Sequence, residues 1–80
     1  MYGIEITYSW GDRENVFGNF NTEEDAYKEM CIIAAEEAYT QNEEFLEENT
    51  CNVYFNAVMK AINLHYDSDD TWCYYRVIKY

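Results

Sequence analysis

The sequence predicts an α+β fold, a small antiparallel sheet with one or two helices packed on one face. Two observations predict the sheet: alternating or β-rich segments lie at both ends of the chain, and a run of turn residues interrupts each of them. A third predicts a helix, because residues 22–39 repeat apolar side chains at helical spacing. Eighty residues make one hydrophobic core, so we expect a single domain spanning 1–80.

The first segment alternates in a way that is typical of a half-buried strand. Ile4, Ile6 and Tyr8 fall on one face, and Glu5 and Thr7 fall on the other. The sequence GDREN then supplies turn residues, and VFGNF resumes an extended pattern. Together these segments predict an N-terminal hairpin.

The helix is predicted to begin at Asn21 or Thr22, since either side chain can cap its N-terminus. Acidic residues 23–25 fill the first turn, where the helix dipole favours anions. We expect the apolar face to pack on the sheet. That face comprises Ala26, Tyr27, Met30, Ile33, Ala34 and Ala38. The sequence TQN at 40–42 is expected to weaken or bend the helix, and the pattern leaves open whether EEFLEEN continues it.

Residues 51–63 fit two structures. Val53, Tyr54 and Phe55 favour a strand. Thr50, however, is available as a helix cap, and the polar residues share one narrow helical stripe. These polar residues are Asn52, Asn56, Lys60 and Asn63. We therefore favour a second helix here.

The last 17 residues, LHYDSDDTWCYYRVIKY, predict a C-terminal hairpin. Two aromatic-rich runs flank the turn-like sequence DSDD. The final strand, 71–79, is long and rich in residues that favour strands.

Charge is distributed unevenly along the chain. Sixteen acidic and five basic residues give a net charge of −11. Residues 21–70 contain thirteen of the acids and only Lys28 and Lys60 as bases. Direct binding to nucleic acid or to an anionic membrane is therefore disfavoured, and a basic protein surface is the natural complement.

The cysteine and histidine residues predict no metal site. Cys31, Cys51 and Cys73 are widely spaced without a CxxC pair, and His65 is the only histidine. We expect free thiols in a reducing compartment and no cofactor. Neither a signal peptide nor an apolar run long enough to span a membrane is visible, so the expected location is the cytoplasm.

No motif predicts catalysis. Counted from Asp67, the positions at which a calcium-binding EF-hand loop needs Gly and Glu hold Trp72 and Ile78. His65 and Cys73 would lie near each other in the predicted hairpin, but no third group is available to orient a thiol–imidazole pair. We therefore expect a protein that is not an enzyme.

Acidic residues of the helix form a stripe beside its packing face. The stripe consists of Asp25, Glu29 and Glu36, joined by Glu43 and Glu47 if the helix continues. These five would span about 33 Å, or about 8 Å between neighbours, a spacing as coarse as that of a row of phosphates.

Two interpretations of this stripe are open: a solvated face that only maintains solubility, or a binding surface. Lys28 is the only base on the helix, and carboxylates four residues apart repel each other, as at Asp25 and Glu29. Solubility alone does not require that cost, so we favour the binding surface.

In composition and layout across the whole chain, the sequence resembles small acidic proteins that phages and mobile elements make against host defences. These are anti-CRISPR and anti-restriction inhibitors of the DNA-mimic type. The resemblance implies a non-enzymatic inhibitor that enters a Lys- and Arg-lined groove of a CRISPR effector or another nuclease in the host cytoplasm. No family-specific motif is matched, so the candidate residues come from the charge pattern. They are the stripe, with Asp25, Glu29, Glu36, Glu43 and Glu47, and the turn, with Asp67, Asp69 and Asp70.

The alternative is a small structural or regulatory protein-interaction module whose acidity serves solubility. In that case the long C-terminal strand would pair with its copy in a homodimer. Competition with nucleic acid for a basic partner distinguishes the two hypotheses.

Overall fold

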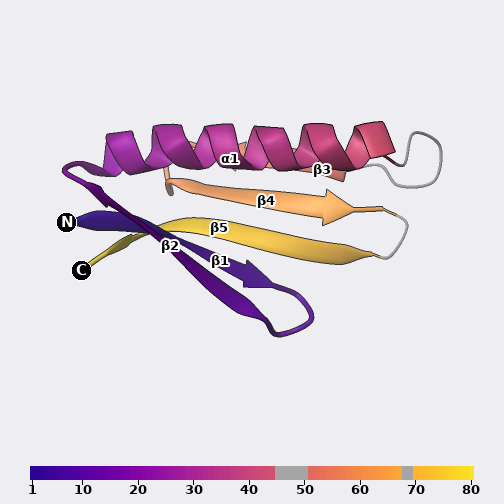
Figure 1. Ribbon diagram of the computed structural model, residues 1–80, viewed down its shortest axis with the longest axis horizontal. Coiled ribbons are helices and arrows are strands. Elements are labelled where there is room, and N and C mark those ends of the chain that lie inside the picture. The colour runs from indigo at the N-terminus through magenta and orange to yellow at the C-terminus, as the bar shows by residue number, and fades with distance from the viewer. Residues whose placement is uncertain (45–50, 68–69) are drawn as a thin grey trace.

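The described part of the chain forms five antiparallel strands and one helix in the order ββαβββ (Figure 1). The computed structural model describes residues 1–44, 51–67 and 70–80, apart from the side chains of 15–17 and 41–44. The elements are β1 (Tyr2–Tyr8), β2 (Arg13–Phe20), α1 (Glu23–Glu44), β3 (Cys51–Asn56), β4 (Ala61–Tyr66) and β5 (Thr71–Lys79). The α+β class, with a helix on one face of an antiparallel sheet, is thus confirmed.

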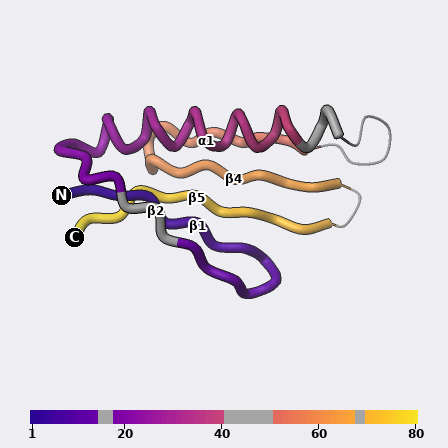
Figure 2. Tube along the Cα trace, viewed as in Figure 1, coloured from indigo at the N-terminus to yellow at the C-terminus, as the bar shows by residue number. Residues whose placement is uncertain are grey.

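The last strand of the chain lies in the middle of the sheet. The strand order is β2-β1-β5-β4-β3, so β5 is hydrogen-bonded to β1 on one side and to β4 on the other (Figure 2). The two chain ends lie side by side, and the amide of Tyr80 donates to the carbonyl of Met1 at 2.9 Å. The edge strands are β2 and β3. Because β5 has partners on both sides, it does not offer the open edge that the predicted strand pairing in a homodimer would need.

Side chains of alternate residues divide the sheet into two faces, and α1 covers one of them. The core between α1 and the sheet contains Ile4 and Ile6 of β1, Ile62 and Leu64 of β4, Cys73 and Tyr75 of β5, and Met30, Ala34 and Ala38 of α1. The predicted packing face of the helix is confirmed, since Ala26 is also buried and Tyr27 and Ile33 pack at the edge of the core.

The predicted start of the helix is also confirmed. The amide of Asp25 donates to Oγ1 of Thr22 at 3.1 Å, so Thr22 is the capping residue. Residues 40–42 lie within α1, so the sequence TQN does not end the helix. Among the described residues, no helix is both long enough and apolar enough to cross a membrane.

The preferred assignment of 51–63 to a second helix is wrong. Residues 51–56 form β3, and β4 begins at Ala61. The turn between them contains no glycine or proline. It is closed by the amide of Met59, which donates to Oδ1 of Asn56 at 3.0 Å, and by Lys60, whose φ is +53°. The polar stripe misled the assignment because residues four apart, such as Asn52 and Asn56, share a face in a strand as well as in a helix.

Candidate functional site

Three predicted stripe residues lie on the outward face of α1. The side chains of Asp25, Glu29 and Glu36 are exposed, and the helix places them along about 16 Å of its axis. Within the described part of the chain, the ion pairs involve Glu5, Asp67 and Asp70, and none involves these three carboxylates. Glu43 belongs to α1, but its side chain is outside the described residues, as is the whole of Glu47.

Two large apolar side chains interrupt the acidic stripe. Ile32 is 51% exposed and Tyr39 is 70% exposed. Each follows an acidic stripe residue by three positions, so helical spacing puts them on the same outward face. Sequence reasoning missed them because it followed only the acids, although the same helical spacing contains the signal. These two side chains place apolar area beside the carboxylates on the outward face of α1.

The acidic turn between β4 and β5 is not brought together with the stripe. Asp67 Oδ1 lies 3.0 Å from Nδ1 of His65, and Asp70 Oδ1 lies 2.8 Å from Nε2 of the same ring. Asn52 also donates to Asp67 at 3.0 Å. Because His65 belongs to the sheet face opposite α1, these two carboxylates have partners on the other side of the molecule. Asp69 lies outside the described residues.

The structure does not form a thiol–imidazole pair. In the β4–β5 register, His65 is opposite Trp72 whereas Cys73 is opposite Leu64, so the imidazole and the thiol are on different faces. Burial, the largest cause, raises the pKa of the Cys73 thiol to about 12. No group of three or more His, Cys, Asp or Glu side chains within the described ranges is placed to hold a metal ion.

The sheet face opposite α1 carries a row of aromatic side chains. The ring centroid of Trp72 lies 4.3 Å from that of His65. It lies 6.0 Å from the ring centroid of Tyr54 and 6.2 Å from that of Tyr74. The row was not predicted, because assigning 51–63 to a helix removed Tyr54 from the sheet.

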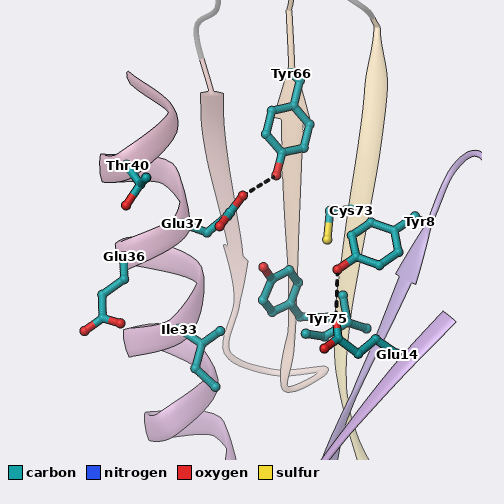
Figure 3. Close-up of a pocket in the computed structure, with 10 residues that line it drawn as sticks. Tyr8, Glu14, Ile33, Glu36, Glu37, Thr40, Tyr66, Cys73 and Tyr75 are labelled. Carbon is teal, nitrogen blue, oxygen red and sulfur yellow. Dashed lines mark hydrogen bonds between the residues drawn. The ribbon is translucent and has the colours of Figure 1, made fainter. Parts of the chain in front are cut away.

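A hollow of about 410 Å³ opens between α1 and the sheet (Figure 3). Glu14 of β2 and Glu37 of α1 face it from opposite sides, and each accepts a hydrogen bond from a tyrosine. Tyr8 donates to Glu14 at 3.1 Å, and Tyr66 donates to Glu37 at 3.3 Å. The stripe residue Glu36 stands at the rim, and in Figure 3 its carboxylate points away from the sheet.

Groups around this hollow make the fold sensitive to alkali. On folding, the pKa of Cys73 rises from 9.0 to about 12, mainly because the thiol is buried. The pKa of Tyr8 rises from 10.0 to about 12, because of burial and, to a smaller extent, its hydrogen bond to Glu14. The unfolded chain therefore loses these protons first. Their contribution to stability is complete below about pH 9 and is lost as the pH rises toward 12.

We expect the free energy of unfolding to fall above pH 9, by about 1.4 kcal/mol per pH unit for Cys73 alone. Urea unfolding at about pH 8 and about pH 10.5 measures this fall. In Cys73→Ala the slope should be shallower, whatever the overall loss of stability. Equal unfolding free energies at the two pH values would show that the thiol is not buried as described.

Comparisons with protein-family models, with curated proteins and with solved structures found no match.

Proposed function

We propose that the protein is a non-enzymatic binding protein that occupies a basic groove in place of nucleic acid. The groove belongs to a nucleic-acid-binding protein of the host, such as a CRISPR effector or another nuclease. The outward face of α1 makes the contact. The observation that carries this proposal is the row of exposed carboxylates, Asp25, Glu29 and Glu36, which form no ion pair with the described bases of their own chain.

Electrostatics favours such a partner. A groove that binds nucleic acid concentrates Lys and Arg, and a protein with a net charge of −11 is attracted to it at long range. Carboxylates on a rigid helix then replace phosphates as acceptors for those cations. Ile32 and Tyr39 add apolar area between the charges, and a tyrosine ring can stack on an arginine guanidinium.

The DSDD turn plays a smaller part in this proposal than the sequence suggested. Asp67 and Asp70 are already paired with His65 on the opposite side of the molecule. A single groove that holds α1 therefore does not reach the turn directly. We expect the turn carboxylates to contribute through the overall negative field.

The test is a charge reversal on the outward face. Pull-down at low salt identifies the partner, and its affinity is then measured at about 0.1 M and about 1 M salt, where the Debye length is about 10 Å and about 3 Å. Binding should weaken steeply at the higher salt, and the partner's own nucleic acid should compete. Glu29→Lys with Glu36→Lys should weaken binding by several kcal/mol, since each opposed charge pair costs about 2–5 kcal/mol.

The matched control reverses Asp12 and Glu24 to Lys. Both side chains are exposed, both lie off the stripe, and the change in net charge is the same. The control should bind nearly as well as the wild type. If both double variants weaken binding equally, total charge and not the α1 face determines affinity. If nucleic acid does not compete, the protein is an interaction module of another kind.

A further inference from the structure

The hollow between α1 and the sheet has the dimensions of a ligand site. Its volume of about 410 Å³ lies within the range of roughly 300–1,000 Å³ that is usual for small-molecule pockets. Residues of five elements line it: β1, β2, α1, β4 and β5. Residues far apart in sequence thus converge on one half-enclosed space.

Two carboxylates are held facing this space. Tyr8 and Tyr66 each donate a hydroxyl hydrogen bond to one of them, to Glu14 and Glu37 respectively. These bonds fix the carboxylates on opposite walls, as Figure 3 shows. Both hydroxyls are protonated at neutral pH, as in any tyrosine, and are therefore donors; burial raises their pKa values further.

Tyr75 supplies a second, independent observation. Its side chain is only 4% exposed, and it lines the hollow. Among the described residues, the hydrogen-bond partner of its hydroxyl is the thiol of Cys73, and sulfur is a weak partner. Because the hydroxyl gives its hydrogen to the sulfur, the lone pairs of its oxygen can accept from a bound donor.

No Lys, Arg or His is among the described residues that line the hollow. The described lining of the hollow is therefore negatively charged, and a cation with several donors is the complement. A guanidinium has five N–H donors in one plane, which suits acceptors on opposite walls, and its flat face stacks on aromatic rings. An ammonium group has three donors at one point and fits this arrangement less well.

We propose that the hollow binds the guanidinium group of an arginine side chain, held between Glu14 and Glu37 with the Tyr75 hydroxyl as a further acceptor. The proposal deepens the proposed function, because the arginine is one of those lining the basic groove of the partner. The site itself is tested on the wild-type protein without any partner. Its variants change Glu14, Glu37 and Tyr75, and of the residues reversed on the α1 face only Glu36 touches its rim. The two proposals can therefore fail independently.

The experiment titrates the protein with N-acetyl-arginine methylamide and follows its backbone amide NMR signals. We expect saturable binding with a Kd of roughly 1–10 mM, as suits one small ligand. The largest shifts should occur around Glu37 and Tyr75. The citrulline analogue has the same shape without the charge, and it should bind at least about tenfold more weakly. The lysine analogue should fall between the two.

Three variants locate the site. Glu37→Gln and Glu14→Gln should each weaken arginine binding about fivefold or more, and Tyr75→Phe about threefold. Glu24→Gln, which removes an exposed carboxylate of the same helix outside the hollow, should leave Kd unchanged. The amide spectrum of each variant reports whether it is folded.

Equal binding of the arginine and citrulline analogues by the wild type would overturn the proposal without reference to any variant. So would shifts confined to the outward side of α1, or full binding by folded Glu14→Gln and Glu37→Gln. If arginine binds in the hollow while reversal of Glu29 and Glu36 leaves partner affinity intact, the site stands and the groove proposal fails.

Discussion

A chain that ends at Asp70 is expected to show no cooperative unfolding transition. The deletion removes β5, the central strand, and with it the backbone partners of both β1 and β4. It also removes Cys73 and Tyr75 from the core. Two separate hairpins and a helix would remain, and an isolated two-stranded hairpin is at best marginally stable in water.

Circular dichroism during urea unfolding measures this effect, with the amide NMR spectrum as an independent readout of tertiary structure. The matched control lacks only Tyr80, which follows β5 and is half exposed. That control should unfold cooperatively, with a loss of roughly 1–3 kcal/mol, because Tyr80 hydrogen-bonds to Asn19 through its hydroxyl and to Met1 through its backbone. A folded, cooperative 1–70 fragment would show that β5 is not the centre of the sheet.

Much of the fold could be predicted because its signals are local. Strand alternation at Ile4 and Ile6 and helical spacing at Met30 and Ala34 are short-range patterns, and each follows directly from the geometry of one element. The cap at Thr22 is similarly local. What the sequence does not reveal is strand order. Placing the last strand between the first and the fourth is a long-range choice, decided by which apolar faces α1 can cover.

The error at 51–63 has a different cause. Asn52 and Asn56 satisfy the strand and helix periods together, so the pattern did not distinguish the two structures. The tight turn at 57–60 lacks the usual glycine, and an Asn56 side-chain bond replaces it. Only the preference of Val53, Tyr54 and Phe55 for strands indicated the correct answer.

For the candidate residues, exposure could be predicted from the sequence, whereas their positions relative to one another across the fold could not. The exposure of Asp25, Glu29 and Glu36 follows from helical spacing alone. The separation of the DSDD turn from the stripe depends on which sheet face His65 occupies, and that requires the assembled sheet. The hollow could not be predicted either. Glu14 and Glu37 are 23 positions apart in the sequence, and they face the same space only because α1 packs on the sheet.

Met30→Ala is expected to lower the free energy of unfolding by about 2–5 kcal/mol, since Met30 is fully buried and truncation leaves a cavity. A domain of 80 residues has about 4–12 kcal/mol of stability in total, so this single change could remove much of it. Ile32→Ala, two positions along the same helix, is the matched control. Ile32 is half exposed, and its truncation should change stability by no more than about 0.5 kcal/mol.

Urea unfolding of the two variants compares them directly, with the denaturant dependence showing whether the folded state is otherwise unchanged. The outcome bears on function as well as on the fold. If Met30 faces the sheet, then Asp25, Glu29 and Glu36 face outward, and Ile32 is available to a partner. Equal destabilisation by the two truncations would mean that α1 packs by a different face. The carboxylate row would then lose the orientation on which its contact with a basic groove depends.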